Sequence, residues 1–345
     1  MTYEEFLRYE IPPADYLVED GIPAALAPGA VDLSGVFGPL PALDSALRRA
    51  RRSLLWRAHR FSPIELAPLG RVRMRDVLPP LSLLPDADAL VAWSNRAQPA
   101  PTRVELLRLL LGAIAQRPER RYVLYADIGD CTIGPSSRAG APALHDVAAV
   151  LPENVVVLFA RNANADDPRI VSVPLGLPRE APPRLAAALA AHAPADISRR
   201  KLAHAKFRLR YERPKLERGR RQIAAVVRTK PWIDQDLRRK QLPPAEYYRA
   251  LLEHRFVISP EGCGIDCLRT WEALYCKCIP IVQRSRHMEA FADLPILFTT
   301  DYSELTPEYL EAEHERILAT EYDFDKLRIG YWRDLIVRAW RRLEA

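Results

Sequence analysis

The chain has 345 residues, of which 48% are hydrophobic and 27% charged, and its formal net charge at pH 7 is +6. This composition is typical of a globular protein, and the length suits two medium-sized domains better than one. Five cysteines in a chain of this length do not form a disulfide framework, so a small disulfide-stabilised fold is excluded.

The N-terminal sequence is acidic and has no apolar stretch behind a basic start, which argues against a secretory signal. The longest apolar stretches, such as Val155 to Ala160, fall far short of the ~20 residues that span a bilayer. We therefore expect a cytoplasmic protein.

Positive charge is concentrated between Arg199 and Lys230, a stretch that we call the basic segment. It holds 13 Lys or Arg and two Glu, so the rest of the chain is net negative. Such a segment attracts nucleic acid, anionic lipid headgroups or nucleotide phosphates, although a solvated linker between domains explains it equally well.

The first half of the chain predicts strands that alternate with helices. In chain order we expect a basic amphipathic helix at Leu43 to Arg57, a strand at Asp88 to Trp93, a helix at Val104 to Ala115, and strands at Tyr122 to Ala126, Val155 to Ala160 and Ile170 to Val173. This alternation indicates a parallel α/β sheet.

A second α/β pattern follows the basic segment. It comprises a strand at Gln222 to Val227, a helix at Pro244 to Glu253, a strand at Arg255 to Ser259, a helix capped by Asp266 and running to Cys276, strands at Cys278 to Gln283 and Pro295 to Thr299, a helix capped by Thr306, and a basic closing helix at Asp325 to Leu343. We therefore expect an N-terminal domain over 1–195, a basic linker over 196–222, and a C-terminal domain with its closing helix over 223–345.

The stretch from Ser259 to Glu272 has the features of a nucleotide site. It predicts a strand, a loop with Gly262 and Gly264, and a helix whose first amides lack partners and attract anions. Arg269 in the first helical turn adds a guanidinium for a diphosphate. Glu272, three residues further on the same face, can accept hydrogen bonds from both ribose hydroxyls. A surface ion pair between Arg269 and Glu272 is the competing interpretation.

The same stretch carries a family resemblance. The run Ser259-Pro-Glu-Gly-x-Gly-Ile-Asp-x-x-Arg-Thr-Trp-Glu-Ala-Leu, followed by Cys278-Ile-Pro-Ile-Val282 and Asp293-Leu-Pro-Ile-Leu297, resembles the donor-domain signature of exostosin-like glycosyltransferases. A weaker resemblance to the strand ends of bacterial members is present in Phe159-Ala-x-Asn162 and Pro174-Leu-Gly-Leu177. The resemblance covers roughly residues 120–320.

The resemblance implies the two-Rossmann-domain architecture called GT-B, with a nucleotide-sugar donor in the C-terminal domain and an acceptor facing the N-terminal one. Two positions depart from the family pattern. Cys263 stands where Asn is common, and Lys277 stands where Gly usually precedes Cys-Ile-Pro, so Lys277 is expected in a strained left-handed helix cap.

Sugar transfer needs stabilisation of the leaving nucleoside diphosphate and a base for the acceptor hydroxyl. No Asp-x-Asp metal motif follows a convincing strand, so we expect no metal and no cofactor besides the nucleotide sugar, with leaving-group charge held by cationic side chains and a helix N-terminus. The expected donor-binding residues are Arg228, Lys230, Ser259, Pro260, Glu261, Gly262, Gly264, Asp266, Arg269, Thr270 and Glu272.

The base is expected from the loop after the Tyr122 to Ala126 strand, where Asp130 is the first choice and Asp127 the second. Asp130 can instead be a turn-forming residue after Gly129. Four clustered cysteines, Cys263, Cys267, Cys276 and Cys278, match no common zinc spacing, and buried reduced thiols are the favoured interpretation.

The resulting hypothesis is a glycosyltransferase that uses a glycan or lipid-linked acceptor, inverts the anomeric centre and works without metal. Alternatives stay open. One is a nucleotide-sugar epimerase or phosphorylase on the same scaffold. Another is a non-enzymatic polyanion-binding protein, although the basic segment lacks the interleaved aromatic residues of a nucleic-acid platform. A third role for the basic segment and closing helix is contact with the inner face of an anionic membrane.

Overall fold

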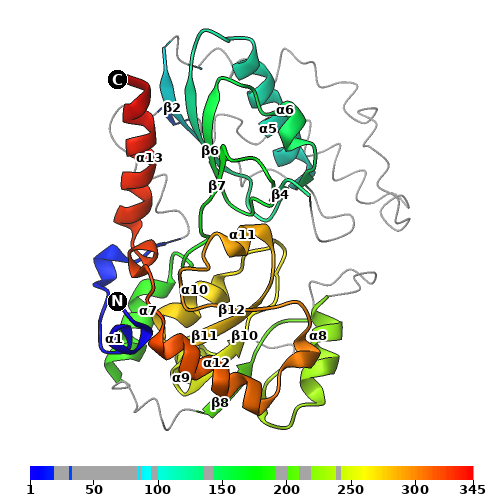
Figure 1. Ribbon diagram of the computed structural model, residues 1–345, viewed down its shortest axis with the longest axis vertical. Coiled ribbons are helices and arrows are strands. Elements are labelled where there is room, and N and C mark those ends of the chain that lie inside the picture. Colours follow the sequence, from blue (N-terminus) through cyan, green and yellow to red (C-terminus); the bar gives the residue numbers. More distant parts are fainter. Residues whose placement is uncertain are drawn as a thin grey trace. The chain divides into compact units, whose positions relative to one another are not determined.

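A computed structural model of the chain describes residues 1–18, 31–32, 84, 87–94, 100–135, 143–191, 201–209, 219–237 and 242–344. The chain divides into two compact units (Figure 1). Unit 1 comprises Met1–Leu26 and Ser172–Leu335, and unit 2 comprises Ala27–Val171 and Ile336–Ala345.

These bounds differ from the expected domains. The N-terminal residues 1–26 belong to unit 1, and the C-terminal residues 336–345 belong to unit 2. Helix α1 (Tyr3–Leu7) belongs to unit 1, where the Phe6 ring stacks on Phe324 with centroids 3.7 Å apart. The Leu17 backbone N–H donates a hydrogen bond of 2.8 Å to the Tyr275 hydroxyl. The junction expected at 196–222 lies inside unit 1.

Unit 2 is built on a five-stranded sheet. Its order is β1 (Val31–Asp32), β2 (Ala89–Ser94), β3 (Tyr122–Asp127), β6 (Val155–Ala160) and β7 (Ile170–Ser172), and the first three of these neighbouring pairs are parallel. A short parallel pair, β4 (Thr132–Ile133) and β5 (Ala143–Leu144), lies outside the sheet.

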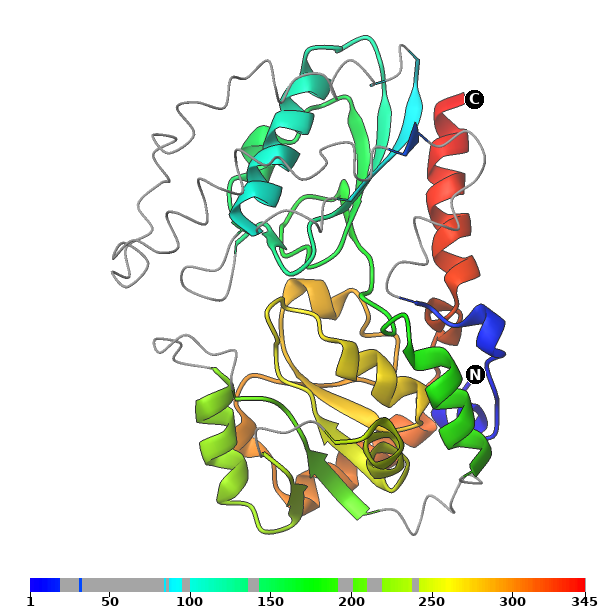
Figure 2. The ribbon, with the colours of Figure 1, turned by 180° about the vertical axis from the view of Figure 1, so that it is seen from behind.

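The core of unit 2 lies between this sheet and its helices. Helix α5 (Ala100–Ala115) and the short α6 (Val147–Val150) lie together on one side of the sheet in Figures 1 and 2. Leu107, Leu110, Leu111 and Ile114 recur at helical spacing in α5 and are fully buried with the strand residues. The end of helix α13 (Ile329–Glu344) joins unit 2, where the Leu343 carbonyl accepts a hydrogen bond from Arg121.

Unit 1 contains a second five-stranded sheet in which all neighbours are parallel. Its order is β12 (Leu297–Thr299), β11 (Ile279–Gln283), β10 (His254–Ile258), β8 (Lys201–Ala205) and β9 (Ile233–Gln235). The helices of unit 1 besides α1 are α7 (Ala181–Ala191), α8 (Arg220–Arg228), α9 (Pro244–Leu252), α10 (Leu268–Tyr275), α11 (Arg286–Glu289), α12 (Pro307–Ala319) and the start of α13. The 3-10 turns among the described residues of unit 1 are η1 (Pro13–Asp15), η6 (Tyr302–Glu304) and η7 (Phe324–Leu327).

The expectation of two Rossmann-like α/β domains is confirmed, and most predicted elements lie within a few residues of the observed ones. The helix cap at Thr306 is confirmed as well, since its hydroxyl accepts a hydrogen bond of 3.1 Å from the Tyr309 N–H. The helix predicted at 43–57 lies outside the described residues. None of the described helices is long and apolar enough to cross a bilayer.

The strand predicted at Gln222 to Val227 is wrong, because these residues belong to helix α8. Its buried residues are Ile223, Ala224 and Val227, which share one helical face, whereas Gln222 and Arg228 are exposed. The true first strand of the unit 1 sheet is β8, which lies within the basic segment.

Candidate functional site

The strand order of unit 1 indicates where a ligand binds. Strand β8 has β9 on one side and β10 on the other, so the chain changes direction across the sheet between β8 and β10. In open parallel α/β sheets, ligands bind at the carboxyl ends of the strands at such a point. The residues after β10 are Ser259 to Asp266, which form the glycine loop expected from the sequence.

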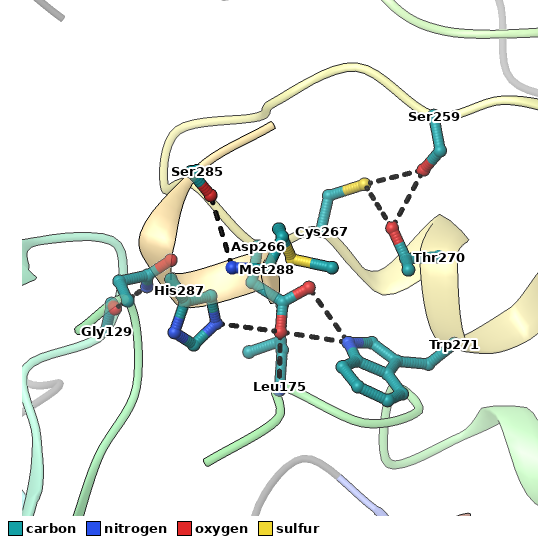
Figure 3. Close-up of polar contacts among 11 residues, drawn as sticks. Gly129, Leu175, Ser259, Asp266, Cys267, Thr270, Trp271, Ser285, His287 and Met288 are labelled. Carbon is teal, nitrogen blue, oxygen red and sulfur yellow. Dashed lines mark hydrogen bonds and ion pairs between the residues drawn. The ribbon is translucent and has the colours of Figure 1, made fainter. Parts of the chain in front are cut away.

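A side chain directly after β10 contacts two side chains at the start of α10. The Ser259 hydroxyl lies 3.0 Å from the Thr270 hydroxyl and 3.1 Å from the Cys267 sulfur. Figure 3 shows these three groups facing one another. Cys267 is the N-cap residue, and no side chain caps the helix. The amides of the first turn therefore have no side-chain acceptor, which is the arrangement that binds anions at helix N-termini.

Arg220, the first residue of α8, holds the glycine loop. Its Nε donates to the Glu261 carbonyl at 2.8 Å, and its Nη1 donates to the Arg208 carbonyl at 3.2 Å. A Cβ atom on Gly262 would lie 3.3 Å from Arg220 Nη2, so the close approach of the guanidinium favours glycine here. The Glu261 N–H donates to the Gln283 side chain at 3.4 Å. Pro260 and Gly264 are buried within the same loop.

Sequence reasoning did not single out Arg220, because it is one of 13 cations in the basic segment. Its place at the start of a helix depends on recognising α8, which the sequence interpretation took for a strand. Lys206, directly after β8, was missed for the same reason. It is 7% exposed and forms an ion pair of 2.8 Å with Asp236, which follows β9. A buried Lys–Asp pair thus lies at the carboxyl ends of these two strands.

Arg269 lies in the first turn of α10, as expected. Its Nε and Nη1 atoms are buried, and neither has a hydrogen-bond partner among the described residues. Buried N–H groups are almost always paired in folded proteins, and an unpaired one costs about 1–3 kcal/mol. The guanidinium thus has two donors available for an anion.

Glu272 differs from expectation in its contacts. It is 9% exposed, and its two carboxylate oxygens accept hydrogen bonds from the hydroxyls of Tyr247 at 2.9 Å and Tyr248 at 3.0 Å, both on α9. Burial raises the pKa of Glu272, whereas the two tyrosine hydroxyls lower it. Both oxygens therefore hold α9 against α10. The two tyrosine hydroxyls make the hydrogen bonds that were expected from the ribose hydroxyls.

Asp266 does not cap α10. It is 3% exposed, and both of its oxygens lie 2.9 Å from the Trp271 indole nitrogen, which donates to them. One oxygen also accepts from the Leu175 N–H at 2.8 Å and lies 3.6 Å from His287 Nε2. Figure 3 shows these groups converging on the carboxylate. Asp266 is therefore a structural residue that joins the end of the glycine loop to three other segments.

Arg228 and Lys230 are not placed as the sequence interpretation required. Arg228 ends a helix instead of a strand, and it is exposed. Lys230 donates from Nζ to the carbonyls of Ser303 at 3.0 Å and Leu305 at 2.5 Å, so it holds the turn η6. Because its ammonium serves these carbonyls, we assign it a positioning role.

The two expected acidic residues of unit 2 differ sharply. Asp127 is 1% exposed, forms an ion pair of 3.0 Å with the equally buried Arg161, and accepts from the Gly129 N–H at 2.8 Å. These contacts give Asp127 a structural role at the end of β3. Asp130, by contrast, has an exposed side chain.

The cysteines remain free thiols, with Cys276 and Cys278 buried and Cys263 exposed. Across the described part of the chain, no three His, Cys, Asp or Glu side chains are grouped to hold a metal ion. Unit 1 thus brings together an uncapped helix start, a glycine loop and two guanidinium groups, those of Arg220 and Arg269, which are groups that can bind an anion.

Comparisons with known proteins identify similar solved structures but no family and no curated relative. No protein-family model matches the sequence, and no curated protein matches it. Among solved structures, the chain is similar to a UDP-forming α,α-trehalose-phosphate synthase from Burkholderia vietnamiensis, with 13% identity, a TM-score of 0.43, and coverage of 88% of this chain and 87% of that one.

Two further solved structures are similar to the chain. One is an α,α-trehalose 6-phosphate synthase from Burkholderia multivorans, with 13% identity, a TM-score of 0.41, and coverage of 88% and 83% of the two chains. The other is an α-glucosyltransferase in complex with UDP and DNA, with 13% identity, a TM-score of 0.35, and coverage of 76% and 83%. TM-scores at this level do not assign the chain to a family.

Proposed function

We propose that this protein is a glycosyltransferase that binds a nucleoside-diphosphate sugar in unit 1 and transfers the sugar to an acceptor hydroxyl. The observation that carries the proposal is the guanidinium of Arg269, whose buried Nε and Nη1 atoms have no partner among the described residues, beside the uncapped start of α10. The resemblance of Ser259 to Leu274 to the exostosin-like donor signature supports the same conclusion.

The charges of the site support a diphosphate as the ligand. Arg220 brings a second guanidinium to the glycine loop through its bond to the Glu261 carbonyl. Guanidinium groups match phosphate oxygens in geometry, and the helix N-terminus adds amide donors and a partial positive charge. These groups can also stabilise the diphosphate as it leaves, so we propose that turnover needs no metal ion.

In the proposed reaction, an acceptor hydroxyl oxygen attacks the anomeric carbon of the sugar. The bond between that carbon and the diphosphate oxygen breaks, and the nucleoside diphosphate leaves with the electron pair. A single displacement of this kind inverts the anomeric centre, and the acceptor proton passes to a carboxylate base. We propose Asp130 as that base, because its side chain is exposed whereas Asp127 is held in a buried ion pair.

We further propose that the acceptor is a glycan or a lipid-linked glycan, and that the enzyme works in the cytoplasm, in contact with an anionic membrane surface where the acceptor is lipid-linked. The exposed Arg338, Arg341 and Arg342 on α13 support that contact.

Calorimetric titration with UDP, GDP, ADP, CDP and dTDP tests the donor site. We expect one of these to bind, and Arg269→Ala to weaken its binding by about 10–100-fold for each hydrogen bond that is lost, since a hydrogen bond to a charged group is worth about 1.5–3 kcal/mol. Arg316→Ala is the matched control, because Arg316 lies on α12 in unit 1 and pairs with Glu313 at the surface. If no diphosphate binds, or if both variants bind as the wild type does, the donor-site assignment fails.

Product analysis with the corresponding labelled sugar donor tests the reaction. Transfer to an acceptor in the presence of a chelator supports a metal-independent transferase, whereas isomerised donor without acceptor indicates an epimerase. Asp130→Asn is expected to retain nucleotide affinity and to abolish turnover. An Asp130→Asn variant with wild-type turnover contradicts the assignment of the base.

A further inference from the structure

Side-chain contacts hold the short turn η6 that follows strand β12. The Asp301 carboxylate caps it by accepting from the Ser303 N–H at 2.9 Å. Thr299, the last residue of β12, donates its hydroxyl hydrogen to the Glu304 carboxylate. Both contacts fix the backbone on either side of Tyr302, the first residue of the turn.

Lys230 fixes the same turn from the end of α8. Its ammonium donates to the Ser303 carbonyl at 3.0 Å and to the Leu305 carbonyl at 2.5 Å. Helix α8 begins with Arg220, the residue that holds the glycine loop. One helix therefore positions the glycine loop at its start and the Tyr302 turn just beyond its end.

Within the part of the chain that the structure describes, the Tyr302 hydroxyl has no hydrogen-bond partner. The residue is 5% exposed, and its hydroxyl oxygen is buried without a hydrogen bond to any described residue. A buried hydroxyl without a partner is destabilising and rare. Because the side chains of Asp301, Thr299 and Lys230 hold the turn, the unpaired hydroxyl is a fixed feature of the turn rather than the result of a loose loop.

The charges that act on Tyr302 belong to the proposed donor site. Burial raises the pKa of Tyr302 well above its usual range, and the negative charge of Glu261 raises it further. The guanidinium groups of Arg269 and Arg220 lower this pKa. The phenol is therefore protonated at neutral pH and can donate a hydrogen bond. It follows β12 at the same edge of the parallel sheet as the glycine loop that follows β10.

We propose that the Tyr302 hydroxyl donates a hydrogen bond to a phosphate oxygen of the bound nucleoside diphosphate, alongside the unpaired N–H groups of Arg269. This assignment rests on the proposed function, to which it adds a binding residue more than thirty positions beyond the glycine loop in sequence. An anionic oxygen satisfies both the phenol and the guanidinium, whereas an apolar sugar face satisfies neither.

The test compares Tyr302→Phe with Tyr309→Phe, a matched control on the first turn of α12 outside the site. The probes are the nucleoside diphosphate that the wild type binds, and inorganic pyrophosphate. Tyr302→Phe is expected to weaken both affinities by about 10–100-fold, and Tyr309→Phe by less than about twofold. The melting temperature of ligand-free Tyr302→Phe should equal or exceed that of the wild type, because the change removes a buried hydroxyl that has no partner.

Each result that differs from this expectation leads to a separate conclusion. If the wild type binds the nucleotide and Tyr302→Phe binds both probes equally well, the inference is wrong and the proposed donor site stands. Loss of nucleotide affinity with unchanged pyrophosphate affinity moves the phenol away from the phosphates and also overturns it. A fall of several degrees in the melting temperature of ligand-free Tyr302→Phe shows a structural hydrogen bond instead. If the wild type binds no nucleoside diphosphate, the proposed function itself fails.

Discussion

The two roles that have been assigned to Asp266 predict very different effects of the substitution Asp266→Asn. As the N-cap expected from the sequence, Asp266 could be replaced by Asn at a cost of no more than a few tenths of a kcal/mol, because the two residues cap helices equally well. In the structure, Asp266 instead accepts hydrogen bonds from the Trp271 indole and the Leu175 backbone. An asparagine cannot accept at both of its terminal atoms.

The magnitude follows from these contacts. Both carboxylate oxygens lie 2.9 Å from the Trp271 indole nitrogen, so either orientation of an asparagine places an amide N–H group against the indole N–H. One buried donor loses its acceptor and a charge-assisted bond is lost, which together cost about 2–3 kcal/mol. For a unit of this size, that corresponds to a fall of roughly 4–12 °C in melting temperature.

Urea unfolding and thermal melting, followed by tryptophan fluorescence and circular dichroism, measure this loss. Asp334→Asn is the control, since Asp334 is an exposed residue of α13 in unit 1 and its substitution should change stability by less than about 0.5 kcal/mol. If Asp266→Asn is no more destabilising than this control, the buried contacts of Asp266 carry no weight and the capping role is restored.

Three further predictions concern the folded state. Asp127→Asn leaves the buried guanidinium of Arg161 without its counter-charge and should cost about 3–5 kcal/mol in urea unfolding; a variant of wild-type stability would contradict the buried ion pair. Lys277→Gly should be about 1 kcal/mol more stable than Lys277→Ala, because only glycine relieves the left-handed backbone at φ 56°, and equal stabilities would count against strain there. Burial lowers the pKa of His204 to about 4 in the folded state, so the stability that this residue contributes is present above the ordinary histidine pKa near 6.5 and is lost as the pH falls towards 4. The loss is about 3 kcal/mol and should disappear in His204→Leu; an unchanged pH profile of unfolding would refute it.

Local sequence patterns predicted the elements that depend on local interactions. The strand over Val155 to Ala160 has its predicted bounds, and Thr306 caps its helix as expected. Helix α8 was misassigned because Gln222 to Val227 is short and rich in small and β-branched residues, which suit either structure. Its helical character depends on the buried face formed by Ile223 and Val227.

In the candidate site, too, local patterns predicted the residues within one segment but not the contacts between distant segments. The glycine loop, Ser259, Thr270 and Arg269 were predicted because they lie within one strand–loop–helix segment. The contacts of Glu272 could not be predicted, since its tyrosine partners lie on another helix. Asp266 was misinterpreted because an acidic residue before a helix usually caps it, whereas here the Leu175 amide, 91 positions away, competes for the carboxylate.

The helix cap at Lys277 is stabilised by an aromatic residue near the N-terminus of the chain. The sequence placed it in a left-handed cap, and the Schellman pattern is present: the Cys278 N–H donates to the Ala273 carbonyl at 2.9 Å, and φ of Lys277 is 56°. Glycine usually occupies such a position because the backbone of other residues is strained there. The Lys277 ammonium lies 3.2 Å from the centroid of the Phe6 ring, and this ring stacks on Phe324. A buried cation–π contact is worth about as much as the strain it offsets, so the N-terminal segment makes a lysine tolerable at the end of α10.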